Sequence, residues 1–363
     1  MAIRIIQSRR ISAAYALASI FSHSLSSTPF TTGFATRYPH HCISSFSSLS
    51  TSLLLQVQIS PLTSSSSSSP SSPSLHPTKN KLCRSLPPSA LRMSTTTSSS
   101  TTKSTLTVAQ VPCLDDNYGY LIHDPETGHT AAVDTPDANA YETELKNRGW
   151  TLTHIFNTHH HWDHTGGNLQ LKENSKVEIY GPASENIPGR DVALNGGDEV
   201  TSFGSGDTPV QIIDVGGHTN GHIAYYFPKD GLVFCGDALF ALGCGKMFEG
   251  TPSQFWDSLK RLRALPEDTV VYCAHEYTQS NAKFAMSVEP GNSKLVSRVA
   301  EITSKRQSGE PTVPSLLSVE KETNPFLRVD VSDEIQKNVG ALSSDSYDVV
   351  FGKVRKAKDN FRG

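Results

Sequence analysis

The N-terminal part of this 363-residue sequence lacks acidic residues. Neither Asp nor Glu occurs before Asp115, whereas nine Lys and Arg lie within residues 1–104. Taking these nine from the total of 32 basic residues leaves 23 against 35 acidic residues in 105–363, a net charge of −12. The near-neutral charge of the whole chain, −3, therefore conceals a basic leader followed by an acidic body.

A stretch without acids that is rich in Arg, Ser and Thr is typical of an organelle transit peptide. Near its start, Arg4, Arg9 and Arg10 alternate with isoleucines and leucines, a pattern that favours a basic amphipathic helix. We therefore expect residues 1–104 to be a targeting leader for the mitochondrion, with the plastid as the alternative destination. The competing interpretation is a disordered low-complexity tail without an address. Translation from Met93 would give a cytosolic form that keeps the whole body.

Long hydrophobic runs, paired cysteines and basic clusters are also missing. No run of about 18 apolar residues exists, so we expect no membrane-spanning segment. The six cysteines form no Cys-x-x-Cys pair and no dense framework, which indicates free, mostly buried thiols in a reducing compartment. The acidic body carries no basic cluster, which argues against nucleic-acid binding. We further expect a monomer.

The body alternates strand-like and helix-like segments up to about residue 281. The pattern of apolar residues and turn signals predicts strands at 106–111, 120–123, 131–133, 152–157, 177–180, 210–215, 222–227, 232–235 and 270–273. It predicts helices at 138–147, 168–173 and 253–264. Farther on it predicts helices with no strand between them, at 293–307, 332–339 and 346–361. This change indicates a layered α/β domain, 105–290, followed by a helical domain, 291–363.

The segment THHHWDHTGG, residues 158–167, carries four potential metal ligands within six positions. These ligands are His159, His161, Asp163 and His164. They cannot all lie on one face of a regular helix or strand, so we expect a loop that turns them inward together. Imidazole nitrogen and carboxylate oxygen suit Zn, Fe and Mn. A lone buried His is more often a satisfied core residue, but four ligands together at a strand's end disfavour that interpretation.

Three further candidates, His218, Asp237 and His275, each follow a predicted strand. Each is a weak signal alone, since a Gly-flanked Asp such as Asp237 is usually a turn residue. Sites in layered α/β folds form beyond the strand ends, so this repeated position is the one that a shared site requires. Together with the 158–167 motif, the three complete a set of seven candidate ligands.

The seven candidates divide between two divalent metal ions. One ion would be held by three imidazoles, those of His159, His161 and His218. The other would be held by a carboxylate and two imidazoles, those of Asp163, His164 and His275. Asp237 could bridge the two ions with one oxygen each. Ions about 3.5–4 Å apart share a hydroxide whose pKa falls towards about 7, so this hydroxide would be the nucleophile, with Asp163 and Asp237 as the catalytic carboxylates.

This ligand pattern resembles that of the metallo-β-lactamase superfamily, and within it the chain is similar to the hydroxyacylglutathione hydrolases, the glyoxalase II family. The similarity is carried by VPCLDDNYGYL, THHHWDHTGG, GHTNGH, GDALFALGCGKMFEGT, HEYT, ETNPFLR and VRKAKDNF. It implies an α/β fold, an αββα sandwich followed by a small all-helical C-terminal domain. It also implies hydrolysis of S-D-lactoylglutathione to D-lactate and glutathione, the second step of methylglyoxal detoxification.

The resemblance also implies which residues meet the glutathione part of the substrate. Lys246 in GCGKMFEG should contact the glycyl carboxylate, and Tyr277 in HEYT should donate to the glutathione backbone. Arg355 and Lys358 match the family's C-terminal basic pair, although charge pattern alone would make them a solvated helix face. Phe248 departs from the family, in which many members have a Tyr that also touches glutathione. The hydrogen bond lost with its hydroxyl is worth about 0.5–1.5 kcal/mol.

Two other functions fit parts of this pattern. A glutathione persulfide dioxygenase would use one iron held by two His and an Asp, but the complete second ligand set and the helical region argue against it. Oxygen uptake on glutathione persulfide would discriminate between the two reactions. A metal-free glutathione-binding protein would need a broken ligand set, and none of the seven candidates is missing.

Overall fold

The structure, a computed structural model, describes residues 104–363. The amphipathic helix expected in the leader lies outside these residues. Within them, four cysteines are buried and free, as the sequence predicted: Cys113, Cys235, Cys244 and Cys273. No helix among the described residues is long and apolar enough to span a membrane.

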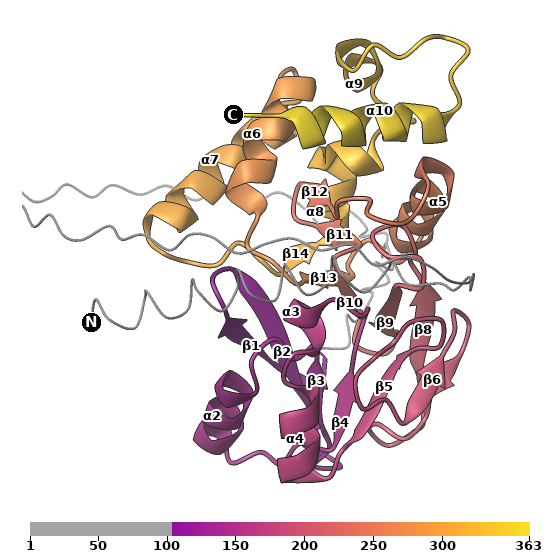
Figure 1. Cartoon of the computed structure of the whole chain (residues 1–363). Coiled ribbons are helices and arrows are strands. Elements are labelled where there is room, and N and C mark those ends of the chain that lie inside the picture. Colours follow the sequence, from indigo (N-terminus) through magenta and orange to yellow (C-terminus); the bar gives the residue numbers. More distant parts are fainter. Residues whose placement is uncertain (1–103) are drawn as a thin grey trace, which may run out of the picture. The chain divides into compact units, whose positions relative to one another are not determined.

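Two six-stranded sheets form the centre of the body (Figure 1). The first sheet contains, in spatial order, β1 (Thr107–Cys113), β2 (Asn117–His123), β3 (Thr130–Val133), β4 (His154–Phe156), β5 (Glu178–Pro182) and β6 (Val192–Leu194). Its first three strands are antiparallel and the rest run parallel from β3 onward. The parallel strands β4 and β5 end at the same edge of the sheet, and their following loops carry residues of the site described below.

The second sheet joins strands from two distant parts of the chain. Its strands in spatial order are β14 (Ser315–Leu316), β13 (Val270–Cys273), β10 (Leu232–Gly236), β9 (Ile223–Phe227), β8 (Val210–Asp214) and β7 (Glu199–Val200). The pair β10–β13 is parallel, and the other pairs are antiparallel. The strand β14 comes from the region in which only helices were predicted, so that part of the prediction is wrong. A two-residue strand carries no alternation that a sequence pattern could reveal.

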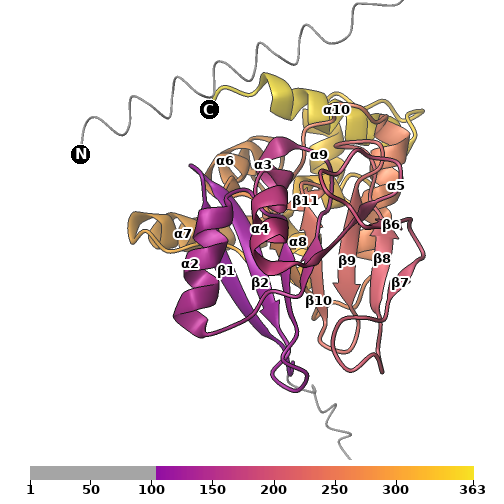
Figure 2. The same ribbon diagram turned by 60° about the horizontal axis from the view of Figure 1, so that its bottom comes forward.

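Helices cover the outer faces of both sheets (Figure 2). The helices α2 (Ala138–Arg148) and α4 (Asn168–Ser175) pack on the first sheet, and α5 (Pro252–Arg263) packs on the second. Aromatic rings fill the space between the sheets, where Phe156 and Tyr225 stack with centroids 4.9 Å apart. The layers therefore run helix, sheet, sheet, helix, which confirms the predicted αββα sandwich.

The helix α2 illustrates why these elements form where the sequence predicted them. Its N-cap, Asp137, accepts a hydrogen bond from the Asn139 N–H at 2.9 Å, and Gly149 ends it in the left-handed conformation at φ 67°. Tyr141 on its inner face is fully buried, and its hydroxyl donates to the Val133 carbonyl at 3.0 Å. Capping and burial thus agree on the ends and the orientation of the helix.

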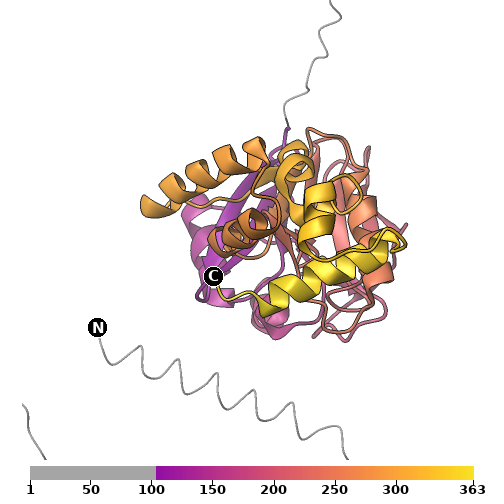
Figure 3. The same cartoon turned by 90° about the horizontal axis from the view of Figure 1, so that it is seen from above.

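The C-terminal helices lie together at one end of the sandwich (Figure 3). They are α6 (Thr278–Val288), α7 (Ser293–Gln307), α8 (Leu317–Thr323), α9 (Asp333–Asn338) and α10 (Tyr347–Asn360), with a 3-10 turn, η1 (Pro325–Leu327), between α8 and α9. The predicted helices at 293–307, 332–339 and 346–361 are confirmed within a residue at each end. The helices α6 and α8 were not predicted.

Candidate metal centre

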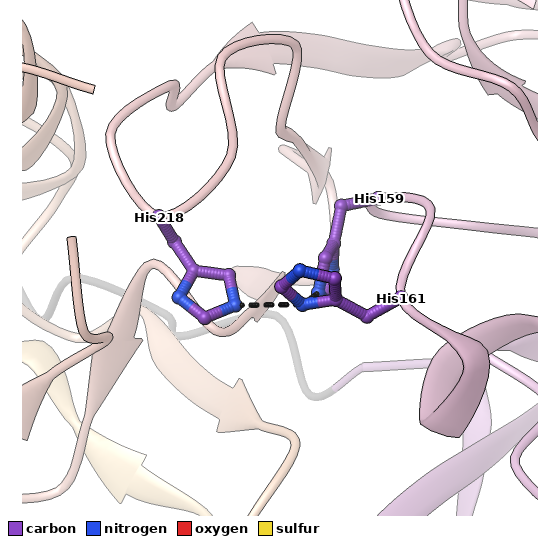
Figure 4. A group of neighbouring side chains, drawn as sticks. All are labelled: His159, His161 and His218. Carbon is purple, nitrogen blue, oxygen red and sulfur yellow. Dashed lines mark hydrogen bonds between the residues drawn. The ribbon is translucent and has the colours of Figure 1, made fainter. Parts of the chain in front are cut away.

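Three imidazoles, which we call the first ligand group, converge from two loops (Figure 4). His159 and His161 follow β4, and His218 follows β8. The Nδ1 atom of His161 lies 3.0 Å from Nε2 of His159 and 3.0 Å from Nε2 of His218. Nitrogens that share a tetrahedral zinc at about 2.0–2.1 Å lie roughly 3.3 Å apart, so this spacing is close to that of a metal site.

The second ligand group consists of Asp163, His164 and His275. The Nε2 atom of His275 lies 3.6 Å from Oδ2 of Asp163, and Nε2 of His164 lies 3.9 Å from it. Asp163 and His164 do not lie on a loop as expected, because Trp162–Thr165 forms the short helix α3. Adjacent residues in a helix point in different directions. Asp163 and His164 therefore approach the second group from two sides.

Asp237, which directly follows β10, lies between the two ligand groups. Its Oδ1 is 3.4 Å from Nε2 of His164 and 3.4 Å from Nε2 of His275, whereas its Oδ2 is 3.3 Å from Nε2 of His218. One carboxylate oxygen therefore faces each group. The structure thus brings all seven sequence-predicted ligands into one place.

Hydrogen bonds to the outer ring nitrogens fix the direction in which the histidines face. Four of these bonds join His159 Nδ1 to Thr158 Oγ1, His218 Nδ1 to the Lys246 carbonyl, His164 Nδ1 to Asp134 Oδ2, and His275 Nδ1 to Asp116 Oδ1, at 2.7–3.0 Å. In each case Nε2 is left to point at the centre of the site. Metal-binding histidines in proteins are held in this way, with a carboxylate or carbonyl on the outer nitrogen.

The charge states of the side chains suit metal binding. Burial, with His218 close by, lowers the pKa of His161 to about 4, and burial also lowers that of His159, so both rings are neutral at pH 7. Burial alone would raise the pKa of Asp237, but the imidazoles of His275 and His164 hold it well below its usual range. Burial alone would lower the pKa of His164, but the carboxylates of Asp237 and Asp134 raise it well above its usual range, so its proton must leave when a metal binds. The first ligand group therefore offers neutral imidazoles beside an ionised carboxylate.

Two buried atoms at the centre lack hydrogen-bond partners within the described part of the chain. They are Nε2 of His164 and Oδ1 of Asp237. A buried polar atom without a partner costs about 1–3 kcal/mol, so such atoms are rare unless something else contacts them. A divalent cation between the ligand groups would contact both. The residues present therefore fit a centre with two metal ions.

Several supporting residues carry no local signal in the sequence. Asp134, with φ 49°, accepts from the Thr158 N–H at 2.8 Å as well as contacting His164. His222 stacks on His159 with centroids 4.5 Å apart and accepts from the Asp237 N–H at 3.2 Å. The second histidine of GHTNGH could have been noticed, whereas nothing near Asp134 marks it. Asn117, on β2, donates to Oδ2 of Asp163 at 3.2 Å.

Three of the residues expected to meet substrate lie at the mouth of the site. The exposed ring of Phe248 packs edge-to-face against His161 and His218, with centroids 5.7 and 5.3 Å away. The ammonium of Lys246 lies 5.0 Å from the Phe248 ring. Tyr277 stacks on His275, with centroids 4.6 Å apart and planes 8° from parallel. A cation and two aromatic rings thus border the metal ligands.

Arg355 and Lys358 lie on one helix, α10, but in different surroundings. The buried guanidinium of Arg355 donates to the carbonyl of Cys244 at 2.9 Å and pairs with Asp359 at 2.9 Å. Lys358 donates to the carbonyl and hydroxyl of Ser280 at 3.2 Å. Arg355 therefore holds the segment that leads to Lys246. Contact of either cation with glutathione stays a prediction.

The C-terminal helices also contact a hairpin of two short strands, β11 (Leu239–Phe240) and β12 (Gly243–Cys244). This hairpin connects Asp237 to Lys246. Asn324 donates to the carbonyls of Phe240 and Gly243 at 3.0 and 2.9 Å. Leu242, in the turn of the hairpin, has a φ of 57°. Its N–H donates to the buried carboxylate of Glu320 at 2.9 Å. The C-terminal helices thus position a segment of the site.

Two family models match consecutive parts of the chain. Residues 119–275 match the metallo-beta-lactamase superfamily, and residues 276–361 match the hydroxyacylglutathione hydrolase C-terminus. The first model spans all seven candidate ligands and most of the sandwich, without β1 and β14, and the second spans the C-terminal helices. The fold and the site together define a metallo-β-lactamase-like sandwich that is extended by a helical region.

Curated relatives show the family within that superfamily. The hydroxyacylglutathione hydrolase of Erythrobacter litoralis is 51% identical over 257 residues, which cover 70% of this chain and 100% of that protein. That of Methylococcus capsulatus is 50% identical and covers 71% of this chain and 100% of the relative. The chain belongs to the hydroxyacylglutathione hydrolase family, as the motifs predicted. A crystal structure of ETHE1 from Myxococcus xanthus is 26% identical and covers 69% of this chain and 98% of that one, with a TM-score of 0.48.

Proposed function

We propose that this protein hydrolyses S-(2-hydroxyacyl)glutathione thioesters, with S-D-lactoylglutathione as the substrate and D-lactate and glutathione as the products. The observation that carries the proposal is the convergence of seven ligands, with Asp237 between two groups and two central atoms without partners. Membership of the hydroxyacylglutathione hydrolase family supports the choice of thioester.

The first ligand group would hold one divalent ion and the second group another, with Asp237 contributing an oxygen to each. Zinc is the expected metal, with iron and manganese as alternatives that accept the same nitrogen and oxygen donors. When bound, two such ions supply a water nucleophile of lowered pKa and polarise the carbonyl under attack. Asp163 and Asp237 are the carboxylates that would hold these ions.

The remaining residues bind and orient the glutathione part. Lys246 stands exposed beside Phe248, where it can pair with the glycyl carboxylate. Burial, with Asp116 nearby, raises the pKa of Tyr277, so its hydroxyl keeps its proton and can donate to a peptide carbonyl of glutathione. Lys358 would add a second cation for the substrate, and Arg355 would support binding by fixing, through the Cys244 carbonyl, the segment that leads to Lys246.

The test is thiol release by the full chain from S-D-lactoylglutathione, compared with S-D-lactoyl-N-acetylcysteamine. Both substrates have the same scissile bond, but only the first has the glutathione carboxylates. We expect efficient hydrolysis of the first and a much higher KM for the second. Equal efficiency would contradict glutathione recognition. Oxygen uptake on glutathione persulfide without thioester hydrolysis would replace the proposal by the dioxygenase alternative.

We also propose that residues 1–104 form a leader that addresses the protein to the mitochondrion, ahead of a catalytic domain, 105–290, and a helical domain, 291–363. Support comes from the acid-free composition of the leader and from matches to relatives that cover only 70% of the chain. A fusion of residues 1–104 to a fluorescent protein tests it, with 93–104 as the control. Diffuse signal from both fusions would contradict targeting, and plastid signal would change the organelle.

A further inference from the structure

A buried carboxylate that no ligand motif includes lies beside the first ligand group. Glu185 is in the loop between β5 and β6, and 8% of its surface is exposed. Its Oε2 accepts from the backbone N–H of His160 at 2.7 Å and contacts Nδ1 of the same residue at 2.8 Å. Its Oε1 accepts from the Thr219 hydroxyl at 2.5 Å and from the Gly221 N–H at 2.9 Å.

These contacts join the two loops that supply the first ligand group. His160 lies between the ligands His159 and His161, and Thr219 directly follows the ligand His218. One carboxylate oxygen is bonded to each loop. Glu185 therefore fixes how far apart the two loops stand, and with them the three imidazole nitrogens that face one another at 3.0 Å.

We propose that Glu185 is a positioning residue that sets the metal affinity of the first ligand group, and that the second group does not depend on it. The inference rests on the two-metal centre of the proposed function. The second group is supported by other carboxylates, those of Asp134 and Asp116. Supporting residues of this kind change metal affinity by about 10–100-fold when removed.

The arrangement of donors requires a carboxylate at this position. The two backbone N–H groups, of His160 and Gly221, bond to different oxygens of Glu185. A Gln side chain has one oxygen and one amide NH2 group, so in either orientation its NH2 would face a backbone N–H that cannot turn away. Glu185→Gln keeps the size of the side chain and loses the connection to one loop.

Close packing around Glu185 leaves the loops little room to compensate. A Cβ placed on Gly221 would lie 2.7 Å from Cγ of Glu185 and 2.2 Å from the Ser184 hydroxyl oxygen, so only glycine fits there. The guanidinium of Arg190 donates to the carbonyl of Glu185 at 2.7 Å and fixes its backbone. The backbone and the side chain of Glu185 are thus both fixed by their neighbours.

The experiment is a competition titration with a zinc chelator, carried out on the full chain and on Glu185→Gln. We expect the wild type to show two sites, and the variant to lose about 10–100-fold in affinity at one site only. Cobalt substitution identifies the site, because the absorption of a group with three imidazoles differs from that of a group with a carboxylate. Equal loss at both sites, or unchanged affinity at both, would overturn the proposal.

Glu289→Gln is the matched control, because Glu289 is a buried carboxylate bonded to Arg328 and Ser332 in the helical region. We expect it to lower Tm without changing either metal affinity. If Glu185→Gln behaves in the same way, Glu185 has only a structural role.

If Glu185→Gln fails to fold, Thr219→Val serves in its place, since it removes one donor to Glu185 and keeps the carboxylate. It should weaken the first site a few-fold, and unchanged affinity would overturn the proposal. A wild type that binds two metals but does not hydrolyse the thioester would contradict the proposed function and leave this inference standing.

Discussion

The first ligand group takes all its imidazoles from two loops that one buried carboxylate, Glu185, joins. The second group takes Asp163 and His164 from a short helix and His275 from the end of a strand, and its supporting carboxylates come from two other places in the chain. The exposure of the supporting carboxylates differs. The side chains of Glu185 and Asp134 are 4% and 3% exposed, whereas that of Asp116 is 44% exposed. Water can replace the contacts of Asp116 but not those of the other two. His275, which Asp116 supports, should therefore be the ligand that is held least firmly.

Asp237→Ala should have the largest effect, because one carboxylate oxygen of Asp237 faces each ligand group. In the proposed two-metal centre its carboxylate would balance charge at both ions, so removing it should cost more than the roughly 100-fold affinity loss seen for supporting residues. We expect at least one metal per chain to be lost, together with nearly all activity. Metal analysis after gel filtration checks this, and two retained metals would contradict the bridging role.

Asp116→Ala should weaken the second group alone, by about 10–100-fold in metal affinity, because it removes the acceptor that fixes Nδ1 of His275. Asp115→Ala is the control, since this neighbouring acid is also exposed and no contact of it with a ligand is found in the described residues. Chelator titration measures both variants. If Asp116→Ala also lowered the metal affinity of the first group, the two groups would not have separate supporting residues.

Lys246→Ala and Arg355→Ala should both raise KM with little change in kcat, because they act on the glutathione part of the substrate. A hydrogen bond to a charged group is worth about 1.5–3 kcal/mol, so the rise for Lys246→Ala should be roughly tenfold or more. Arg355→Ala should also lower Tm, since it leaves the buried Cys244 carbonyl without its donor. A large fall in kcat at unchanged KM would show that these assignments are wrong.

The basic limb of the pH profile should depend on Lys358. Burial, with Arg355 nearby, lowers the pKa of Lys358 to about 8. Below this pH the ammonium is charged and can pair with a substrate carboxylate, and above it the charge is lost, so kcat/KM should fall as pH rises through about 8. Lys358→Met should raise KM at pH 7 and flatten this limb. An identical limb in the variant would exclude Lys358 as its source.

Phe248→Tyr should have the smallest effect. The ring already packs against the first ligand group, so the new hydroxyl adds one hydrogen bond worth about 0.5–1.5 kcal/mol. We expect KM to fall by about two- to tenfold with kcat unchanged. Phe248→Leu is the companion variant that tests the ring itself. A KM for Phe248→Tyr that equals the wild type would show that the position does not touch glutathione.

The layers and the ligands could be predicted from the sequence because both have local signals. Apolar strands with a glycine or histidine at their end or within three residues after it identify β4, β8, β10 and β13, together with the candidate ligands that follow them. The four-residue helix α3 and the two-residue strand β14 are too short to show a periodic pattern of apolar residues. The surrounding structure stabilises them, so the sequence does not predict them.

Supporting residues could not be predicted for a different reason. Glu185 lies 25 residues beyond His160 in the chain, and its role depends on contacts that only folding creates. Asp116 lies 159 residues before His275. The burial of Arg355 was likewise hidden, because a basic residue on a helix looks solvated until the segment that it contacts is known. The metal ligands lie in short motifs that can be recognised in the sequence, whereas the residues that position these ligands do not.

Anomalous X-ray diffraction at a metal edge, on crystals of the protein prepared with zinc, would show how many metal ions the seven ligands hold. We expect two anomalous peaks per chain, one at His159, His161 and His218 and the other at Asp163, His164 and His275, with Asp237 in contact with both. A single peak, or two peaks that do not share Asp237, would contradict this expectation.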